Sequence, residues 1–441
     1  MLYEVKLIKK VCFVKNIIFL TFLNLWSMDK NKGAPSFYKT VDAYLSSGWN
    51  VTLINPKYDD GVTPKISGLN QVTFKSNFYP LVKIKKIGFL GRIFHNIYGN
   101  YILCKLGEKI LKKYNYKACI YSYEVNSVYA GGKLARKYNL PFVTRFQGTI
   151  LAPIKDNLFN RLRRYPHFQA LRTKANVTIM TDDGTKGNVV LKRLKNDSEI
   201  VRFWRNGVDI KLEAPKNIAE MEEIKQHLGI NQNEKVLLTV SRLVGWKRVD
   251  RAIEALAVVV KEKPNVKLVV VGDGEEKQNL VTLVKKLNIT KNVLFIGAVP
   301  QTEVKNYLDL ADVFLSLYDL SNVGNPLLEA MSRGKPIITL NVGDTASLIK
   351  NNENGVILEL SQLDEIPRYV HKIIDNNEYA KMLGNNAKRY AKDHFWSWQD
   401  RMKAELALVG NLYDSWNFSN ERNIISIRSN ESEAVTSRRC R

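Results

Sequence analysis

The chain has 441 residues, which is long for a single hydrophobic core, so two domains are expected. Hydrophobic residues make up 45% and charged residues 25%, the proportions of an ordinary globular protein. The 67 Lys and Arg residues exceed the 43 Asp and Glu residues, and the net charge of +24 indicates an anionic partner. A phosphorylated substrate or a membrane surface is favoured. Nucleic acid is not expected, because the sequence has no RNA-binding signature, zinc-finger spacing or heptad repeat.

The first apolar run, VKNIIFLTFLNLW at residues 14–26, is interpreted as a buried strand. Its apolar core is far shorter than the ~20 residues of a membrane-spanning helix. No small-residue cleavage site of a signal peptide follows it, and the residues before Lys15 are expected to form a poorly specified extension. The four cysteines are too scattered for a metal-ligand pair, so a reduced, cytoplasmic compartment and no metal site are predicted.

Strand-like and helical patterns follow one another through the first half of the chain. The strand-like runs are NIIFLTFL, NVTLIN, KACIYSY, PFVTRFQ and NVTIMTD, and the helical segments are SFYKTVDAYLSSG and AGGKLARKYNL.

The second half alternates more regularly. Its strand-like runs are VLLTV (236–240), VKLVVV (266–271), VLFIG (293–297), VFLSL (313–317), PIITL (336–340) and GVILEL (355–360). They are rich in Val, Ile and Leu with little polar alternation, which is typical of strands buried on both faces. The segments VDRAIEALAVVVKEK and EKQNLVTLVKKL between them have the apolar spacing of helices.

This alternation predicts an α/β protein with two doubly wound parallel sheets in tandem. Pro, Gly and charged residues interrupt the pattern near residues 210–234, so an N-terminal domain is assigned to residues 1–212 and a C-terminal domain to 213–400. A helix over 401–419 and a disordered tail over 420–441 complete the chain. Ligands of such sheets bind at the carboxyl ends of strands, so two facing domains suggest a cleft.

Arg242 and Lys247 stand in SRLVGWKRVD, between the first strand of the second half and the helix after it. Two cations beside helix N–H groups at a strand end suit a diphosphate. A solvated basic loop explains either cation alone, and both interpretations stay open on the residues themselves.

VGDGEEKQ, at residues 271–278, forms a second turn from strand to helix. A nucleotide base or ribose can approach Gly272 and Gly274, where no side chain blocks it. A tight turn with an acidic helix start explains the same residues. The dinucleotide fingerprint G-x-G-x-x-G is absent.

YDLSNVGNPLLEAM follows the strand VFLSL. Ser321, Asn322 or Asn325 is expected to cap a helix whose first turn holds Pro326. Such a terminus offers unpaired backbone N–H groups to an anion, here those of Val323, Gly324 and Asn325.

Glu329 comes one turn into that helix, among apolar neighbours. A solvated carboxylate is the simplest interpretation. Because the flanking Leu, Ala and Met residues are expected to pack, a partly buried carboxylate with a hydroxyl or amide partner is favoured. Gly334 is expected to end the helix.

Several segments, in order and at suitable intervals, resemble the donor domain of the retaining glycosyltransferases of family 4 (glycosyl transferases group 1), which have the GT-B fold. The segments are SRLVGWKRVDRAIEA, VVVGDGEE, VLFIGAVPQTEVKNYLDLADVFLSLYD, and GNPLLEAMSRGKPIIT with ENGVIL. FWRNGVDI resembles the family's domain junction, and RYAKDHFWSWQDRMKAELALVGNLYD resembles its C-terminal helix. The resemblance covers about residues 200–415. It implies two Rossmann-like domains facing across a cleft, with that helix crossing back to the first domain.

The resemblance also implies roles for individual residues. Arg242 and Lys247 would hold the donor diphosphate and stabilise the departing nucleoside diphosphate, and Glu329 would bind the ribose hydroxyls. The implied donor site further includes Gly272, Asn322, Val323, Gly324 and Asn325. Two cations and a helix terminus can replace a metal in neutralising the leaving group, so metal-independent transfer without a cofactor is expected. Retention in this family is explained by same-face attack, with a donor phosphate oxygen taking the acceptor proton.

The sequence departs from the family's pattern at three places. Ser321 stands where relatives have a second Glu that contacts the donor sugar, and Asp319 or the Ser321 hydroxyl is expected to replace it. Gln147, before Gly148, stands where many members have His near the reacting carbon, and a Gln side chain can donate and accept hydrogen bonds to a sugar. The N-terminal glycine loop is reduced to KNKGAPS, with Gly33.

Residues 75–117 combine many lysines and aromatic residues with a single acid, Glu108. A solvated helix face explains this composition, but related enzymes often use lipid-linked acceptors, so peripheral association with an anionic inner membrane face is preferred. Arg161, Arg163 and Arg164 add to that basic surface.

Glu124 and Asn126 follow the strand that ends in YSY and are candidates for the acceptor site. The five histidines show no metal spacing and are interpreted as structural or exposed. Trp396 and Trp398 are expected to anchor the crossing helix by packing.

The sequence therefore predicts a retaining hexosyltransferase that moves a sugar from a nucleoside diphosphate to a hydroxyl of a glycan or lipid-linked acceptor, in cell-surface polysaccharide or glycolipid synthesis. Ser321 and Gln147 keep a second interpretation open, a catalytically inactive protein of the same fold that binds sugar nucleotides. A GT-B epimerase or phosphorylase is a third. A nucleotide-dependent oxidoreductase is disfavoured by the missing fingerprint.

Overall fold

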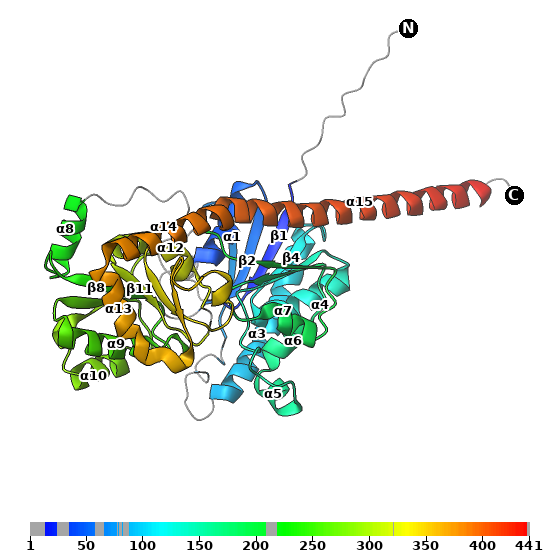
Figure 1. Ribbon diagram of the computed structural model, residues 1–441. Helices are drawn as coiled ribbons and strands as arrows, with labels where there is room; N and C mark the ends of the chain where they lie inside the picture. The colour runs from blue at the N-terminus through cyan, green and yellow to red at the C-terminus, as the bar shows by residue number, and fades with distance from the viewer. Residues whose placement is uncertain are drawn as a thin grey trace, which may run out of the picture. The chain divides into compact units, whose positions relative to one another are not determined.

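The computed structural model describes residues 14–23, 35–57, 66–76, 78, 82, 88–208, 218–320 and 322–438 (Figure 1). It contains two β-sheets, one of seven strands and one of six, each flanked by helices. The predicted α/β class and the two doubly wound sheets are confirmed. Among the predicted site residues, Gly33 and Ser321 lie outside these described ranges.

The first sheet has the strand order β3-β2-β1-β4-β5-β6-β7. Its strands are β1 (Asn16–Thr21), β2 (Asn50–Pro56), β3 (Asn70–Phe74), β4 (Cys119–Tyr123), β5 (Phe142–Phe146), β6 (Val177–Thr181) and β7 (Ile200–Trp204). The pairs β1–β2, β1–β4, β2–β3 and β6–β7 are parallel. The five predicted strands are present, and β1 is the buried strand expected from the first apolar run.

The two strands that the sequence did not predict, β3 and β7, are the edges of this sheet. Only Phe74 of β3 is buried, and no residue of β7 is. Edge strands are half solvated, so NQVTF and IVRFW lack the continuous apolar run that identifies a central strand.

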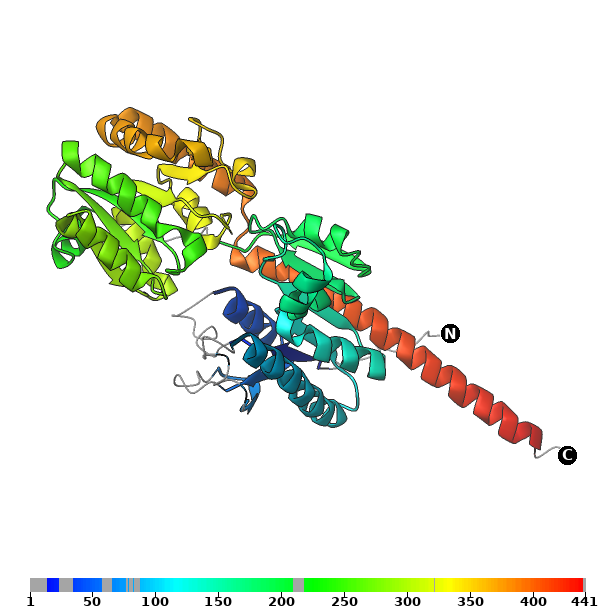
Figure 2. The ribbon, with the colours of Figure 1, turned by 90° about the horizontal axis from the view of Figure 1, so that it is seen from below.

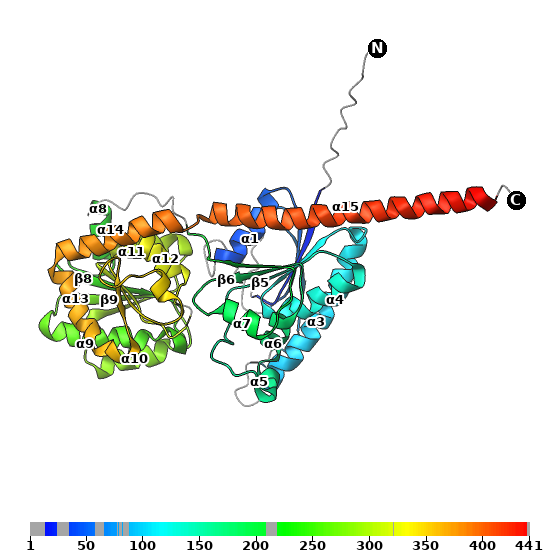
Figure 3. The ribbon, with the colours of Figure 1, turned by 45° about the vertical axis from the view of Figure 1, so that its right-hand side comes forward.

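The helices that accompany the first sheet are labelled in Figures 1 and 3. They are α1 (Pro35–Ser46), α3 (Gly88–Lys113), α4 (Val128–Tyr138), α5 (Leu158–Arg163), α6 (Tyr165–Arg172) and α7 (Gly187–Arg193). The two helices predicted from SFYKTVDAYLSSG and AGGKLARKYNL correspond to α1 and α4.

The second sheet has the order β10-β9-β8-β11-β12-β13, and all five neighbouring pairs are parallel. The strands are β8 (Lys235–Val240), β9 (Val266–Val271), β10 (Val293–Gly297), β11 (Val313–Ser316), β12 (Ile337–Leu340) and β13 (Val356–Leu358). All six predicted strands are confirmed.

Two apolar clusters cover the two faces of this sheet. Successive residues of β9 alternate between them, with Leu268 and Val270 in one cluster and Val269 and Val271 in the other. The first cluster includes residues of α9 (Val249–Glu262), α10 (Lys277–Lys286) and α13 (Ile366–Asp375); the second includes residues of α11 (Val304–Leu310), α12 (Asn325–Ser332) and α14 (Asn377–His394). A further helix, α8 (Ile218–His227), precedes β8.

The last helix, α15, runs from Trp398 to Arg438 and is the longest ribbon in Figure 2. The sequence placed the end of this helix at residue 419 with a tail after it, whereas the helix extends to Arg438. The sequence has neither Gly nor Pro between residues 411 and 438, so nothing in it ends the helix, although the apolar pattern weakens there.

By compactness the chain divides into two units. The first unit comprises residues 1–24, 40–144 and 406–441, and the second comprises residues 25–39 and 145–405. Helix α15 thus begins in the second unit and continues in the first. The expected domain boundary near residues 210–234 falls partly on residues 209–217, outside the described ranges, and it stays a prediction.

Within the first unit, α15 is held by contacts far apart in sequence. The Lys15 ammonium binds the Asp414 carboxylate at 2.6 Å, and the Trp416 indole N–H donates to the Asn139 carbonyl at 2.6 Å. The rings of Tyr413 and Trp49 meet edge to face, 5.5 Å apart. These contacts account for the ordering of the helix up to this point.

Within the second unit, a charged cluster is fully buried at the start of α15. Glu405 accepts hydrogen bonds from Arg145 at 3.1 Å and from Arg401 at 2.9 Å, and the exposed fraction of all three residues is 0%. The Arg401 guanidinium also lies 4.5 Å from the centroid of the Trp204 ring. Of the two tryptophans predicted as anchors, Trp398 is buried, whereas Trp396 is exposed and contacts Trp204 from outside.

Candidate functional site

Lys247 and Arg242 lie in the loop between β8 and α9, at the carboxyl end of β8. Lys247 ends a short 3-10 turn (Gly245–Lys247), and its ammonium lies 4.1 Å from the centroid of the Tyr318 ring. Burial lowers the pKa of Lys247 to about 8. The exposed Arg242 guanidinium lies 5.7 Å from the ring centroid of Trp246. The loop thus presents two cations stacked on aromatic rings, and one of them, Lys247, is half-buried.

Tyr318 and the strand ends around it form the floor under Lys247. The Tyr318 hydroxyl donates to the Val240 carbonyl at 2.9 Å, and burial raises the pKa of this phenol to about 12. The ring is therefore neutral throughout the ordinary pH range, and its face stabilises the Lys247 cation through the ring quadrupole.

Gly272 and Gly274 bring the loop after β9 against the loop after β8. Gly272 has φ +134°, and a Cβ there would collide with the Ser241 carbonyl oxygen. A Cβ on Gly274 would collide with the Leu243 carbonyl. The Leu243 N–H in turn donates to the Asp273 carbonyl at 2.9 Å. This close packing of two backbones is sufficient to require glycine at both positions.

Helix α12 begins differently from the prediction. Its N-cap residue is Gly324, and no side chain caps it. The Asn322 amide instead donates to the Val342 carbonyl at 3.1 Å, and Asn325 is already the first helical residue. The expected side-chain cap from Asn322 or Asn325 is therefore wrong, because Asn325 already lies inside the helix and Asn322 stands two residues before the N-cap position. Pro326 in the first turn is confirmed.

Glu329 is half-buried and has an amide partner, as the sequence predicted. Gln301 donates its side-chain N–H to a Glu329 carboxylate oxygen at 3.0 Å. The flanking apolar residues Leu328 and Ala330 are buried, so the carboxylate is held in a fixed position on α12. It can still accept further hydrogen bonds, since a carboxylate has about four acceptor sites.

Asp319, expected to substitute for the missing second Glu, lies in an ion-pair network. Arg251, which is buried, contacts its carboxylate at 2.7 Å, and Arg248 does so at 3.3 Å. A sugar hydroxyl at Asp319 would share an acid already bound by two guanidinium groups. The Ser321 alternative falls outside the described residues.

Gln147 and Asn325 are brought together within the second unit by a residue that the sequence did not single out. The Asn206 amide donates to the Gln147 side-chain oxygen at 3.2 Å and to the Asn325 side-chain oxygen at 3.0 Å. Asn206 belongs to the FWRNGVDI segment, whose family resemblance was the available signal. The three amides form a polar row beside the N-terminus of α12.

Asp183 is a second residue that sequence reasoning missed. Its carboxylate is buried and accepts hydrogen bonds from the Thr185 hydroxyl at 2.6 Å and the Thr185 N–H at 3.2 Å. A Cβ on Gly148, which has φ +114°, would come within 2.6 Å of this carboxylate. The Asp183 charge also raises the pKa of Lys247, against the larger lowering by burial. Its position directly after β6 was a signal that could have identified it.

The acceptor candidates Glu124 and Asn126 belong to the first unit, after β4. Glu124 has φ +71° and ψ 160°, a region that residues other than glycine rarely adopt. The Asn126 carbonyl accepts from the Asn100 amide at 2.8 Å, and its side-chain oxygen accepts from Asn96 at 3.0 Å. Asn126 therefore joins α3 to this turn, whereas Glu124 occupies a strained position at a strand end.

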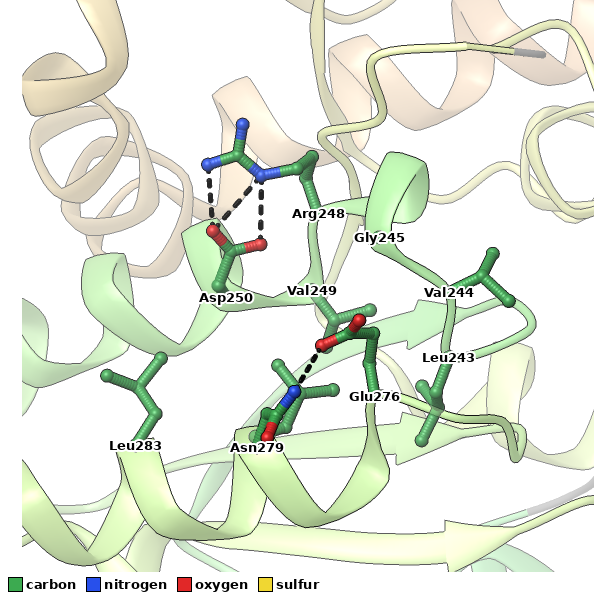
Figure 4. Close-up of a pocket in the computed structure, with 10 residues that line it drawn as sticks. Leu243, Val244, Gly245, Arg248, Val249, Asp250, Glu276, Asn279 and Leu283 are labelled. Atoms are coloured by element: carbon green, nitrogen blue, oxygen red, sulfur yellow. Dashed lines mark hydrogen bonds and ion pairs between the residues drawn. The ribbon is translucent and has the colours of Figure 1, made fainter. Parts of the chain in front are cut away.

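A pocket of about 290 Å³ lies on the other side of the β8 loop, between the starts of α9 and α10 (Figure 4). Figure 4 shows the Arg248 guanidinium turned to Asp250, to which it donates at 2.8 Å, and the Asn279 amide turned to Glu276. Neither Lys247 nor Glu329 is among the residues that line it.

Within the described ranges, no group of three or more His, Cys, Asp or Glu side chains could hold a metal ion. His95 contacts the Ser76 hydroxyl at 2.7 Å, and His371 lies 3.3 Å from Glu262. Among the helices described, none is long and apolar enough to cross a bilayer.

The family model for glycosyl transferases group 1 matches residues 220–390. Over 176 residues the chain is 32% identical to an N-acetyl-alpha-D-glucosaminyl L-malate synthase of Bacillus anthracis, with 40% of this chain and 45% of the relative covered. Over 207 residues it is 28% identical to an alpha-monoglucosyldiacylglycerol synthase of Acholeplasma laidlawii, covering 46% and 51%. The chain thus spans about half the length of these curated relatives.

Solved structures resemble the whole fold. A sucrose-phosphate synthase from Thermosynechococcus elongatus superposes with a TM-score of 0.72 at 18% identity, covering 90% of this chain and 100% of the other. Alr3699/HepE of Anabaena, solved with UDP and glucose, gives a TM-score of 0.70 at 18% identity and the same coverage. At this identity the likeness establishes the fold, which is GT-B with two Rossmann-like domains.

Proposed function

We propose that this chain, whose residues 220–390 belong to the glycosyl transferases group 1 family, moves a sugar from a nucleoside diphosphate to an acceptor hydroxyl. The observation that carries the proposal is the pair of cations after β8, with the Lys247 ammonium half-buried above the Tyr318 ring. When the glycosidic bond to the diphosphate breaks, negative charge develops on the leaving phosphate. A desolvated cation stabilises that charge more than a solvated one does.

In the proposed site, Lys247 and Arg242 bind the diphosphate and Glu329 binds the ribose hydroxyls. The N-terminus of α12, with the N–H groups of Gly324 and Asn325, faces the distal phosphate. Two cations and this terminus neutralise the leaving group, so the proposed transfer needs no metal and no cofactor.

The sugar itself is proposed to lie against the amide row of Gln147, Asn206 and Asn325. Amides donate and accept hydrogen bonds but do not titrate, so they orient sugar hydroxyls without acting as a general base. The donor's own phosphate oxygen then takes the acceptor proton, and attack on the face that the phosphate leaves retains the anomeric configuration. We therefore propose a retaining hexosyltransferase of family 4.

The proposed acceptor is a hydroxyl of a glycan or of a lipid-linked glycan, in polysaccharide or glycolipid synthesis. Relatives named for glycolipid synthesis support this choice, among them the alpha-monoglucosyldiacylglycerol synthases and a mannosyltransferase acting on a phosphatidylinositol monomannoside. Glu124, in its strained position after β4, is the acceptor-binding candidate of the first unit.

A screen of nucleoside diphosphates followed by a transfer assay tests the proposal. The diphosphates of uridine, guanosine and adenosine are compared by thermal shift, because a ligand that binds only the folded state stabilises it by mass action. The sugar nucleotide of the best base is then incubated with enzyme, and release of nucleoside diphosphate is measured with and without a water-soluble glycoside acceptor. Binding without any turnover would instead identify a non-catalytic sugar-nucleotide-binding protein.

Substituting Glu329 tests the ribose assignment. Glu329→Gln is expected to weaken binding of the best nucleoside diphosphate about 10- to 100-fold, since hydrogen bonds to a charged acceptor contribute about 1.5–3 kcal/mol. The measurement is titration calorimetry with the nucleotide and with its 2′-deoxy analogue. The wild type should bind the 2′-deoxy analogue more weakly than the nucleotide. Glu329→Gln should bind the two compounds with nearly equal affinity.

The control for this experiment is Glu303→Gln, an exposed carboxylate in the adjacent turn Gln301–Glu303. It should bind both nucleotides as the wild type does. Equal losses for the deoxy analogue in the wild type and in Glu329→Gln would show that this carboxylate does not contact the ribose.

The depressed pKa of Lys247 predicts a pH dependence. Burial lowers this pKa to about 8, so the free enzyme holds the Lys247 proton below that pH and loses it above. kcat/KM should therefore fall about tenfold per pH unit above pH 8, whereas kcat should fall only at higher pH, because a bound diphosphate favours the protonated amine. In Lys247→Arg, whose guanidinium stays charged, residual activity should not decline in this range. A wild-type profile that is flat to pH 10 would contradict the assignment.

Peripheral membrane association is proposed on the surface of α3. Four residues of one helix face, Leu90, Phe94, Ile97 and Tyr101, are each about half exposed, while Asn96, Asn100 and Leu103 on the other face are buried. Exposed lysines continue the outer face toward the C-terminus, and Lys105 lies 4.7 Å from the Tyr101 ring centroid. An apolar stripe that runs into cations suits an anionic lipid surface at the inner membrane face. The vesicle experiment below includes a variant of this stripe.

A further inference from the structure

Helix α5 (Leu158–Arg163) has three large apolar side chains that are mostly exposed in the described structure. None of its residues is buried, and the exposed fractions of Leu158, Phe159 and Leu162 are 73%, 67% and 61%. A helix of a globular protein ordinarily turns its apolar residues to the core. Here three of the six side chains of the helix are large, apolar and exposed. An exposed apolar patch of this kind lowers solubility unless a membrane or a partner covers it.

Cations surround this apolar tip. Residues 151–173 contain one acid, Asp156, and five cations: Lys155, Arg161, Arg163, Arg164 and Arg172. The single acid binds two of them, accepting from Arg161 at 2.6 Å and from Arg172 at 2.8 Å. His167 of α6 adds no charge at neutral pH, because burial lowers its pKa to about 4. The segment therefore keeps a clear positive excess around its exposed apolar residues.

A pocket of about 410 Å³ lies between α5 and α6 (Tyr165–Arg172). Its lining includes Arg161 from α5, Arg172 and Gln169 from α6, and Thr173 after it. Asp156, 20% exposed, holds both arginines through one carboxylate, which fixes the spacing of two guanidinium groups at the pocket. Two arginines at fixed spacing can donate to the oxygens of a phosphate, while Gln169 and Thr173 beside them are hydrogen-bonded to each other at 3.1 Å.

We propose that the α5–α6 hairpin docks on a bilayer containing anionic phospholipid. Leu158, Phe159 and Leu162 enter the boundary between headgroups and acyl chains, and a lipid phosphate occupies the pocket beside Arg161 and Arg172. The apolar tip matches the acyl-chain region of a phospholipid, and the basic pocket matches its phosphate. A soluble phosphate would account for the pocket but not for the exposed apolar side chains. The inference rests on the proposed membrane association but names a second surface, on a different unit from α3.

Vesicle co-sedimentation of the full chain tests this docking. Vesicles of phosphatidylcholine alone are compared with vesicles that also contain phosphatidylglycerol. The wild type should bind the anionic vesicles, and Leu158→Ser, Phe159→Ser and Leu162→Ser together should weaken this binding at least tenfold. Because no residue of α5 is buried, the triple variant should keep the thermal stability of the wild type.

A control variant removes three other exposed large apolar residues elsewhere in the chain. Val258→Ser, Leu360→Ser and Met382→Ser together change side chains that are 49%, 50% and 41% exposed, all in the second sheet's domain. This variant should bind anionic vesicles as the wild type does. Equal loss in both triple variants, or none in the α5 variant, overturns the docking proposal.

Three further arms separate the other sources of binding. Arg161→Gln with Arg172→Gln should weaken binding to anionic vesicles only, and millimolar inorganic phosphate should not displace the wild type. Displacement by phosphate, together with insensitivity to the α5 substitutions, would identify a site for free phosphate and overturn the proposal. A variant of α3 with Leu90→Ser, Phe94→Ser and Ile97→Ser is measured in the same assay. If this α3 variant loses all vesicle binding while the α5 variant binds as the wild type does, the proposal is also overturned.

Failure of the docking can be distinguished from failure of the proposed enzyme activity. Transfer to a water-soluble acceptor is measured on the same α5 variant without vesicles and should equal that of the wild type. If the enzyme is active and the α5 substitutions do not change its vesicle binding, only this inference is overturned. An inactive wild type that still binds vesicles through α5 leaves the docking in place and overturns the proposed transfer.

Discussion

Lys247→Gln is expected to lower kcat for sugar transfer by about 10²- to 10³-fold, the usual effect of removing one preorganised group that stabilises transition-state charge. The ammonium lies 4.1 Å from the centroid of the Tyr318 ring, and burial has already removed much of its water. In such surroundings its interaction with a leaving phosphate is stronger than at a solvated position. Steady-state kinetics with the donor identified by thermal shift gives the measurement.

The effect should appear in kcat more than in KM, because negative charge on the diphosphate increases as the sugar leaves. Lys261→Gln is the matched control. Lys261 is an exposed lysine in the last turn of α9, far along the same helix from the loop, and its substitution should leave both constants unchanged. A loss below tenfold in Lys247→Gln would mean that another group stabilises the departing nucleotide.

Glu405→Gln is expected to destabilise the folded chain by about 3–5 kcal/mol, the cost of leaving a buried charge without its partner. Glu405 is the shared acceptor of Arg145 and Arg401, and all three side chains lie away from solvent. Neutralising it leaves two guanidinium groups in the same buried space. The midpoint of the associated thermal transition should fall by about 10 °C, measured by circular dichroism.

An exposed ion pair provides the comparison for this prediction. Lys263 contacts the Asp375 carboxylate at 2.6 Å, with side chains 32% and 55% exposed. Asp375→Asn should change the free energy of unfolding by no more than about 1 kcal/mol, as is usual for surface pairs. If the two variants melt alike, the buried cluster contributes no more than a surface contact, and the desolvation argument is wrong.

The strands of the second sheet could be predicted closely because each is a continuous apolar run, and all but the edge strand β10 are mostly buried. VKLVVV and VLFIG correspond residue for residue to β9 and β10. The edge strands β3 and β7 could not, since a half-solvated strand mixes polar and apolar residues as a loop does. The end of helix α15 was hard to predict for another reason. The helix continues because no Gly or Pro interrupts it, and the absence of such a residue is weaker evidence for a helix than a periodic apolar pattern.

The candidate site was predictable where it depends on local order. Arg242, Lys247 and Glu329 follow from the alternation of strand, turn and helix, and the amide partner of Glu329 follows from its apolar neighbours. Asn206 could not be assigned in this way. It joins Gln147 and Asn325, which lie 59 and 119 residues from it in sequence, and no local pattern encodes such a contact. The depressed pKa of Lys247 likewise depends on burial that only the fold creates.

Helix α15 has a consequence for the order in which the chain completes its folding. The first unit needs residues 406 onward, and Lys15 meets its partner Asp414 only across 399 residues of sequence. Synthesis starts at the amino end, so almost the whole chain must be made before Asp414 is available to Lys15, the residue just before β1. The unit that begins synthesis is therefore the last to be finished, and a chain cut short before α15 lacks part of its first unit as well as its end.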